Sequence, residues 1–290
     1  MAVYKHNYQA YSGPLTSSAL RFLILARYAY QRIFGSRIFL ALFLICFVPP
    51  LGAAVLIYLQ HNAKALQILQ VSIDELIPID AAFFQVLLYI QSSLGFILAV
   101  LVGPGLISPD LTNNALPLYL SRPLTRRDYV LGKMSALLIL LSAITWLPLS
   151  CLFFFQAKMA GIAWLWEHLR LEVAIFTGAW LWMLVISLLA IALSAWVRWK
   201  PIAGALIFGV FIVGGGFGAL VNEILFTRWG SLMNIGLLMD TAWRWLFRGE
   251  GTPDSQALPV WGAFAGLFCF CGVCLLLLSK KLKAYEVVRS

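Results

Sequence analysis

The chain has 290 residues, of which 62% are hydrophobic and only 11% are charged, and its mean hydropathy is +0.89. A soluble fold of this composition would leave too much apolar surface in water, so the sequence excludes a soluble protein and indicates one embedded in lipid. The net charge of +9 comes from basic residues between the apolar runs, which is typical of cytoplasmic membrane loops and argues against nucleic acid as a partner.

The first element in chain order is a basic and apolar segment at residues 17–37, SSALRFLILARYAYQRIFGSR. It combines Leu, Phe, Ile and Tyr with four arginines, which predicts an interfacial helix on the cytoplasmic leaflet whose arginines reach lipid phosphates. The arginines do not fall on one helical face, so a simple juxtamembrane basic segment is the alternative. Both interpretations predict contact with membrane lipids.

Six apolar runs follow, each close to the roughly 20 residues that a helix needs to cross a bilayer. They occupy residues 38–59, 82–107, 134–156, 172–197, 201–221 and 258–279. The sequence therefore predicts an all-α fold, with residues 1–290 forming a single transmembrane domain of six spanning helices.

Lys and Arg residues are distributed unevenly between the two sides that these spans define. Fifteen lie on the side that carries both tails, and six lie on the opposite side. Because positive residues are retained on the cytoplasmic side, both termini are predicted to be cytoplasmic. An even number of spans agrees with this orientation.

The cytoplasmic loop between the second and third spans, residues 108–133, carries the most specific pattern. Ser108, Pro109 and Asp110 predict the start of a short helix: a capping hydroxyl, a proline in the first turn and an acid near the positive end of the dipole. Pro117 then interrupts this helix, so the loop is predicted to hold short, separated coupling helices.

A second helix start is predicted at Thr125–Asp128, where Thr and Asp fit a capping box, and this helix should continue into the third span. Basic residues gather around it at the membrane face, namely Arg122, Arg126, Arg127 and Lys133. Such an ordered basic loop favours a docking surface for another protein. A basic anchor on anionic lipid is the alternative.

The fifth span is dense in glycine, and Gly214 with Gly218 forms a small-xxx-small pair that permits close approach of another helix. One interpretation is packing within a single subunit. The other is a position at a dimer interface or beside a substrate path. Both interpretations are compatible with the sequence.

The outer segment at residues 222–257 sets tryptophans among arginines. This pattern suits a helix at the level of the lipid headgroups or a re-entrant segment. Interfacial anchoring is the simpler interpretation, and a substrate gate is the alternative.

Several other chemistries find no support in the residues. No GxxxxGK[ST] phosphate-binding loop occurs, so ATP would have to be hydrolysed by a partner. The middles of the spans almost lack ionisable residues, which argues against ion-coupled transport. The three histidines are scattered, and the cysteines at 269, 271 and 274 are interpreted as packing residues. We therefore predict no catalytic, cofactor-binding or metal site in this chain.

The sequence ISPDLTNNALPLYLSRPLTRRDYVLGK, between the second and third of six spans, resembles the signature loop of type 2 ABC transporter permeases. The resemblance is greatest to the bacterial group linked with multicopper enzyme maturation, and the order of elements resembles the family over the whole chain. The positions that match the family's loop are Asp110, Leu120, Ser121, Arg122, Pro123, Arg126, Tyr129, Gly132 and Lys133.

This resemblance implies a permease subunit in a bacterial inner membrane, paired with a second copy or a related permease. Two copies of a separate ABC ATPase subunit would bind ATP and Mg, dock on the loop at residues 108–133 and drive export of a lipid-like or amphipathic substrate. The resemblance also places the second and fifth spans beside the dimer interface and the substrate path. The alternative is a non-transporting scaffold or mechanotransmission subunit that acts on periplasmic partners.

Overall fold

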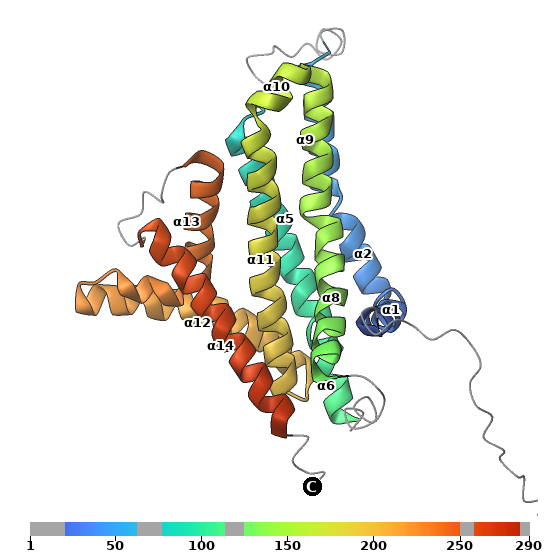
Figure 1. Ribbon diagram of the computed structural model, residues 1–290, viewed down its shortest axis with the longest axis vertical. Coiled ribbons are helices and arrows are strands. Elements are labelled where there is room, and N and C mark those ends of the chain that lie inside the picture. The colour runs from blue at the N-terminus through green and yellow to red at the C-terminus, as the bar shows by residue number, and fades with distance from the viewer. Residues whose placement is uncertain (1–20, 63–76, 114–124, 250–257, 285–290) are drawn as a thin grey trace, which may run out of the picture.

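The computed structural model describes residues 21–62, 77–113, 125–249 and 258–284 (Figure 1). Every regular element in these residues is helical. In chain order the helices are α1 (Arg21–Ile33), α2 (Arg37–Ile45), α3 (Val48–Gln60), α5 (Ala81–Val102), α6 (Pro104–Thr112), α8 (Arg126–Ile144), α9 (Trp146–Ala160), α10 (Ile162–Glu167), α11 (Leu169–Trp196), α12 (Lys200–Leu225), the 3-10 helix η3 (Trp229–Met233), α13 (Ile235–Arg248) and α14 (Val260–Ala284).

The described residues contain six helical stretches that are long and apolar enough to cross a membrane. They are Arg37–Gln60, Ala81–Thr112, Arg127–Ala160, Leu169–Trp196, Lys200–Leu225 and Val260–Lys281. Each coincides with one of the six runs predicted from the sequence. The predicted fold class, all-α with six membrane-spanning helices, is confirmed.

Three of these stretches are broken just before a proline. The breaks separate α2 from α3, α5 from α6 and α8 from α9, and the prolines that follow them include Pro49, Pro104 and Pro148. Proline lacks the N–H group that would continue the helical hydrogen-bond ladder, and its ring crowds the preceding turn. After the break between α5 and α6, helix α6 packs against α11.

Helix α11 is the centre of the bundle. It contacts α5, α6, α8, α9, α12, α13 and α14, and 72% of its most apolar stretch is buried. Small residues allow this close packing: a Cβ added at Gly103 would lie 2.7 Å from the Cβ of Ala190. The junction of α5 and α6 therefore approaches α11 at van der Waals distance.

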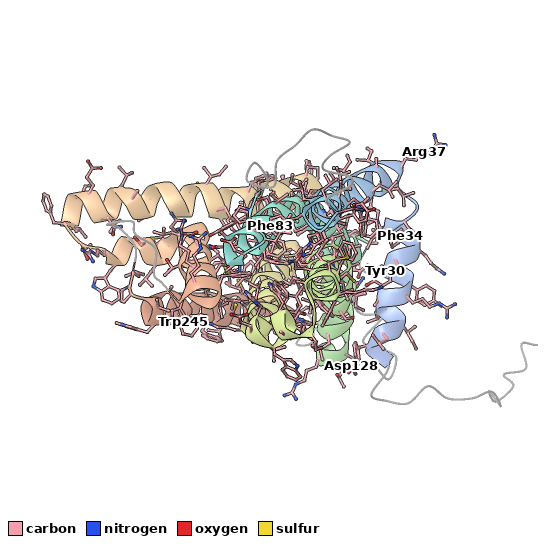
Figure 2. All side chains as sticks on the ribbon, turned by 90° about the horizontal axis from the view of Figure 1, so that it is seen from above. Tyr30, Phe34, Arg37, Phe83, Asp128 and Trp245 are labelled. Atoms are coloured by element: carbon pink, nitrogen blue, oxygen red, sulfur yellow. The ribbon has the colours of Figure 1, made fainter. Side chains whose placement is uncertain are left out.

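Two helices lie across the bundle instead of along it. Figures 1 and 2 together show α1 crossing beside α8 at one end of the bundle and α12 projecting sideways. Only 17% of the most apolar stretch of α12 is buried, and η3 runs back along it. The described chain begins at α1 and ends with α14 at the same end of the bundle, where α6 also lies (Figure 1).

Helix α13, which falls within the segment predicted to lie on the outer side, packs against α5, α11 and α14. Trp243 is buried and its Nε1 donates a hydrogen bond to the carbonyl of Gly178 at 3.0 Å. Tyr89 of α5 donates to the carboxylate of Asp240, which also pairs with Arg244 at 3.0 Å. A polar and aromatic contact therefore fixes α13 on the side of α5 and α11.

Candidate functional site

The described parts of the loop predicted to couple to a partner are the C-terminal part of α6 and the N-terminal part of α8, which lie at one end of the bundle. Leu120, Ser121, Arg122 and Pro123 lie outside the described residues, and so does the side chain of Arg126. The structure places the other predicted residues in two helices, Asp110 in α6 and Arg127, Tyr129, Gly132 and Lys133 in α8. Of these five, Arg127 is exposed and the others are buried.

The helix start predicted at Thr125–Asp128 is confirmed. Thr125 Oγ1 accepts a hydrogen bond from the backbone N–H of Asp128 at 3.2 Å, and the Asp128 carboxylate accepts from the backbone N–H of Thr125 at 2.9 Å. These two bonds form a capping box that satisfies donors at the first turn of α8. The position at which α8 begins is therefore marked by a local pair of residues.

The helix start predicted at Ser108 is wrong. Helix α6 begins at Pro104, so Ser108, Pro109 and Asp110 lie in its interior and toward its C-terminal end. Pro104 follows the break at Gly103 and occupies the first helical position, where a missing N–H costs nothing. The earlier proline therefore begins the helix, and Ser108 is left free to bond to another helix.

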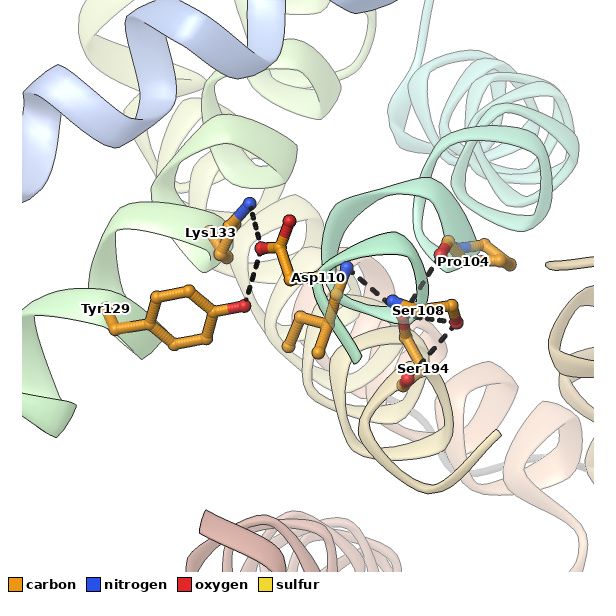
Figure 3. Close-up of polar contacts among 7 residues, drawn as sticks. Pro104, Ser108, Asp110, Tyr129, Lys133 and Ser194 are labelled. Atoms are coloured by element: carbon orange, nitrogen blue, oxygen red, sulfur yellow. Dashed lines mark hydrogen bonds and ion pairs between the residues drawn. The ribbon is translucent and has the colours of Figure 1, made fainter. Parts of the chain in front are cut away.

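That other helix is α11, and the contact is made by Ser194. Ser194 Oγ accepts hydrogen bonds from the backbone N–H groups of Ile107 at 3.3 Å and Ser108 at 3.0 Å (Figure 3). It donates to the carbonyl of Pro104 at 3.1 Å, while Ser108 Oγ donates to the carbonyl of Val197 at 2.7 Å. A serine from a distant helix thus caps the first turn of α6 and fastens it to the end of α11.

The opposite face of α6 is fastened to α8 by three side chains, which we call the coupling clamp: Asp110, Tyr129 and Lys133. Asp110 Oδ2 accepts a hydrogen bond from the Tyr129 hydroxyl at 2.8 Å and lies 2.8 Å from Lys133 Nζ (Figure 3). Tyr129 and Lys133 are four residues apart and share one face of α8. Lys133 Nζ also lies 5.5 Å from the centre of the Tyr129 ring.

Burial determines the strength of the coupling clamp. Asp110 is 8% exposed, Tyr129 1% and Lys133 8%. A carboxylate and an ammonium so far from water attract each other strongly, but each pays a large desolvation cost if its partner is removed. The pair therefore holds the two ends of the loop together, and loss of one member would leave an uncompensated buried charge.

Helix α1 completes this end of the bundle by packing on α8. A Cβ added at Gly132 would lie 2.6 Å from the carbonyl oxygen of Phe22 and 2.9 Å from Leu25 Cβ, so only glycine fits there. One turn along α8, the Tyr30 hydroxyl donates to the carbonyl of Ala136 at 2.8 Å. Burial raises the pKa of Tyr30 to about 12, so this hydroxyl stays protonated and keeps donating.

The two glycines singled out in the fifth span contact the same chain. A Cβ added at Gly218 would lie 2.5 Å from the carbonyl oxygen of Gly230, and one at Gly214 would clash with the carbonyl oxygen of Met233. Both partners belong to η3. The structure therefore assigns these glycines to the packing of α12 against η3, and a role at a dimer interface stays a prediction.

Ser194 and the contact of α1 with Gly132 were not found by sequence reasoning. Ser194 lies 86 residues from Ser108, inside an apolar run, and a single serine in such a run carries no signal of its role. Gly132 was found through the family's loop pattern, but its partner was not. Within the described residues, no group of three or more His, Cys, Asp or Glu side chains is placed to hold a metal ion.

Comparison with known protein families gives one match. The family model described as "ABC-2 family transporter protein" matches residues 24–278, which includes every spanning stretch except the last few residues of the sixth. A search of curated proteins found no match. The matched range covers the coupling clamp, Ser194 and Gly132.

Proposed function

The chain belongs to the ABC-2 family of transporter proteins, and we propose that it is the permease that couples ATP hydrolysis to export of an amphipathic or lipid-like substrate. Family membership makes the chain a membrane subunit of an ABC transporter, which works with an ATPase subunit. In this proposal the ATPase subunit binds ATP and Mg, and this chain supplies the docking loop, the membrane path and the mechanical link between them.

The observation that carries the proposal is the coupling clamp at the ends of the loop. Asp110 on one side of the loop is bound to Tyr129 and Lys133 on the other, at 2.8 Å in both contacts. A force applied to the loop by a docked ATPase would therefore reach α6 and α8 together. A loop that only connected two spans would not need a buried ion pair to fix its ends.

Movement of α6 and α8 has a direct route into the bundle. Helix α6 is bonded to the end of α11 through Ser194, and α11 contacts most of the other helices. Helix α8 carries α1 on its glycine face at Gly132. Closely packed helices move as units, so closure of an ATPase dimer would shift α6, α8 and α11 as one body.

We propose the following assembly: two permeases, each a copy of this chain or a related one, with two ATPase subunits in a bacterial inner membrane. Both termini would be cytoplasmic. The positions of α1, α6 and the end of α14 at one end of the bundle support this orientation (Figure 1). The exposed apolar surface of α12 supports a second permease as its cover, with lipid covering the rest.

The class of substrate is supported by a cavity of about 630 Å³ between α12, η3 and α14. Its walls are almost entirely apolar and include Val210, Phe217, Met233 and Phe270. A site of this size and character suits an acyl chain or another apolar group better than an ion.

The decisive experiment reverses two charges in the loop, Arg122→Glu with Arg126→Glu, in the complex purified with its ATPase. We expect the ATPase to be lost from the complex, or ATP hydrolysis to continue without transport, because a basic docking surface has become acidic. The measurements are native mass spectrometry of the complex and lipid-stimulated ATPase activity in vesicles. The matched control is Arg228→Glu with Arg248→Glu, which makes the same change of charge on the predicted outer side.

Each outcome of this experiment decides between alternatives. Normal co-purification and normal coupled activity in the loop variant would overturn the docking role. If the native complex itself hydrolyses ATP but moves no lipid or amphiphile across the vesicle membrane, the mechanotransmission alternative is favoured. In that case the clamp would transmit force to periplasmic partners instead of opening a substrate path.

A further inference from the structure

A groove of about 430 Å³ lies beside the coupling clamp. It is bounded by α1, by the start of α2, by the junction of α5 and α6, and by the first residues of α8 and α12. The volume falls within the range of sites that bind small molecules. Asp110 and Lys133 line it, so two members of the coupling clamp form part of its wall.

The charges of the groove do not balance. Three basic side chains line it, Arg32 of α1, Lys133 of α8 and Lys200 of α12, against the single carboxylate of Asp110. Within the described residues Asp110 is paired with Lys133, and neither Arg32 nor Lys200 has a carboxylate partner. Arg32 and Lys200 are exposed and come from helices far apart in the sequence, so the groove presents two uncompensated positive charges to one ligand.

Apart from Ser36 and Tyr28, the remaining walls are apolar, and they continue onto the exposed surface of the second spanning stretch. Ile33, Phe39 and Leu101 line the groove, and Leu101 is 46% exposed although it lies within the second spanning stretch. Helix α1 lies across the bundle, as a helix in the membrane interface does (Figure 2). A positive rim at the interface with an apolar wall below it is complementary to a molecule that has an anionic head and an acyl chain.

We propose that this groove binds one anionic phospholipid from the adjacent leaflet. Arg32 and Lys200 hold the phosphate, and the first part of an acyl chain lies against Phe39 and Leu101. The anionic headgroup compensates the charges of the two basic side chains, and the acyl chain covers the apolar wall of the groove. This proposal depends on the membrane location of the chain and not on the coupling function.

The test is a titration of the purified full chain in detergent with phosphatidylglycerol or phosphatidylcholine, followed by native mass spectrometry. We expect one tightly bound phosphatidylglycerol and at least about tenfold weaker binding of phosphatidylcholine. The variant Arg32→Glu with Lys200→Glu should weaken phosphatidylglycerol binding by about tenfold or more. The matched control is Arg27→Glu with Arg198→Glu, because these exposed arginines lie close by in the sequence, carry the same charge and do not line the groove.

A second variant tests the apolar wall without a change of charge. Gly105 lines the groove, and a Cβ placed there would meet no atom of another part of the described chain within 4 Å, so Gly105→Leu introduces a side chain into the groove from an unobstructed position. We expect this variant to fold normally and to lose phosphatidylglycerol binding. Equal loss of binding in the Arg27/Arg198 control, or unchanged binding in Gly105→Leu, would overturn the proposal.

A competition separates a lipid from a free anion. Inorganic phosphate at millimolar concentration should not displace phosphatidylglycerol, because it lacks the acyl chain that contacts Phe39 and Leu101. If inorganic phosphate at that concentration binds the native chain and displaces phosphatidylglycerol to the same extent, the groove is a site for free phosphate and the assignment to lipid is overturned.

Discussion

Helices α11 and α12 are consecutive in the chain but are held in place by different kinds of contact. The end of α11 is tied to α6 by Ser194, and α6 is tied to α8 by the coupling clamp, so polar side chains join three helices. Helix α12 instead touches η3 through glycine backbone at Gly218 and Gly230 and leaves most of its surface uncovered. The two helices also differ in burial: 72% of the most apolar stretch of α11 is buried, against 17% of that of α12.

The difference indicates where the molecule is rigid by itself and where it depends on its surroundings. A buried ion pair and a capping hydroxyl have strict geometry, so they hold three helices in one arrangement. The exposed apolar surface of α12 is instead covered by lipid or by another subunit. Its glycine contacts with η3 lie along one side of the helix. The first region suits transmission of force, and the second suits assembly.

The largest effect is expected from removing the acid of the clamp. Asp110→Ala leaves Lys133 buried without its carboxylate, which should cost about 3 to 5 kcal/mol of stability. The loss of stability is measured by thermal unfolding of the detergent-purified chain, monitored by size-exclusion chromatography. Asp110→Ala with Lys133→Met removes both charges and should recover most of the loss. A single variant as stable as the native chain would contradict the contrast between the two regions.

A smaller effect is expected at the contact of α12 with η3. Gly218→Ala drives a methyl group toward the Gly230 carbonyl and should cost about 2 kcal/mol, the usual range for an overpacked contact. Gly216→Ala on the same helix is the control, because its Cβ would meet no other described atom within 4 Å. The control should be neutral or more stable, since alanine favours helix. Equal melting temperatures for the two variants would show that η3 is not packed on α12 through Gly218.

The smallest effect is expected at the cap of α6. Ser194→Ala removes the side-chain oxygen that accepts from the backbone N–H groups of Ile107 and Ser108, and should cost about 1 kcal/mol. Ser187→Ala, in the same helix, is the control because Ser187 Oγ is buried with no hydrogen-bond partner among the described residues. Hydrogen exchange read by mass spectrometry should show faster exchange at Ile107 and Ser108 in Ser194→Ala alone. Unchanged exchange there would contradict the capping role.

The sequence predicted much of the fold and part of the site. Six apolar runs were enough to place the six spanning stretches, and the capping box at Thr125–Asp128 was visible because both partners lie within one turn. The start of α6 was missed because a helix-start pattern at Ser108 competes with Pro104, four residues earlier. The local sequence is compatible with a helix start at either position, and the packing of α6 on α11 favours the start at Pro104.

The sequence by itself determined the lipid environment, the six spanning stretches and the start of α8, because hydropathy and capping act over a few neighbouring residues. Only the tertiary structure decided that Asp110 meets Tyr129 and Lys133, that Ser194 caps α6, and that α12 lies across the bundle. These contacts join residues from 19 to 87 positions apart. Their formation depends on how helices cross and how closely backbones approach, and no local pattern encodes either.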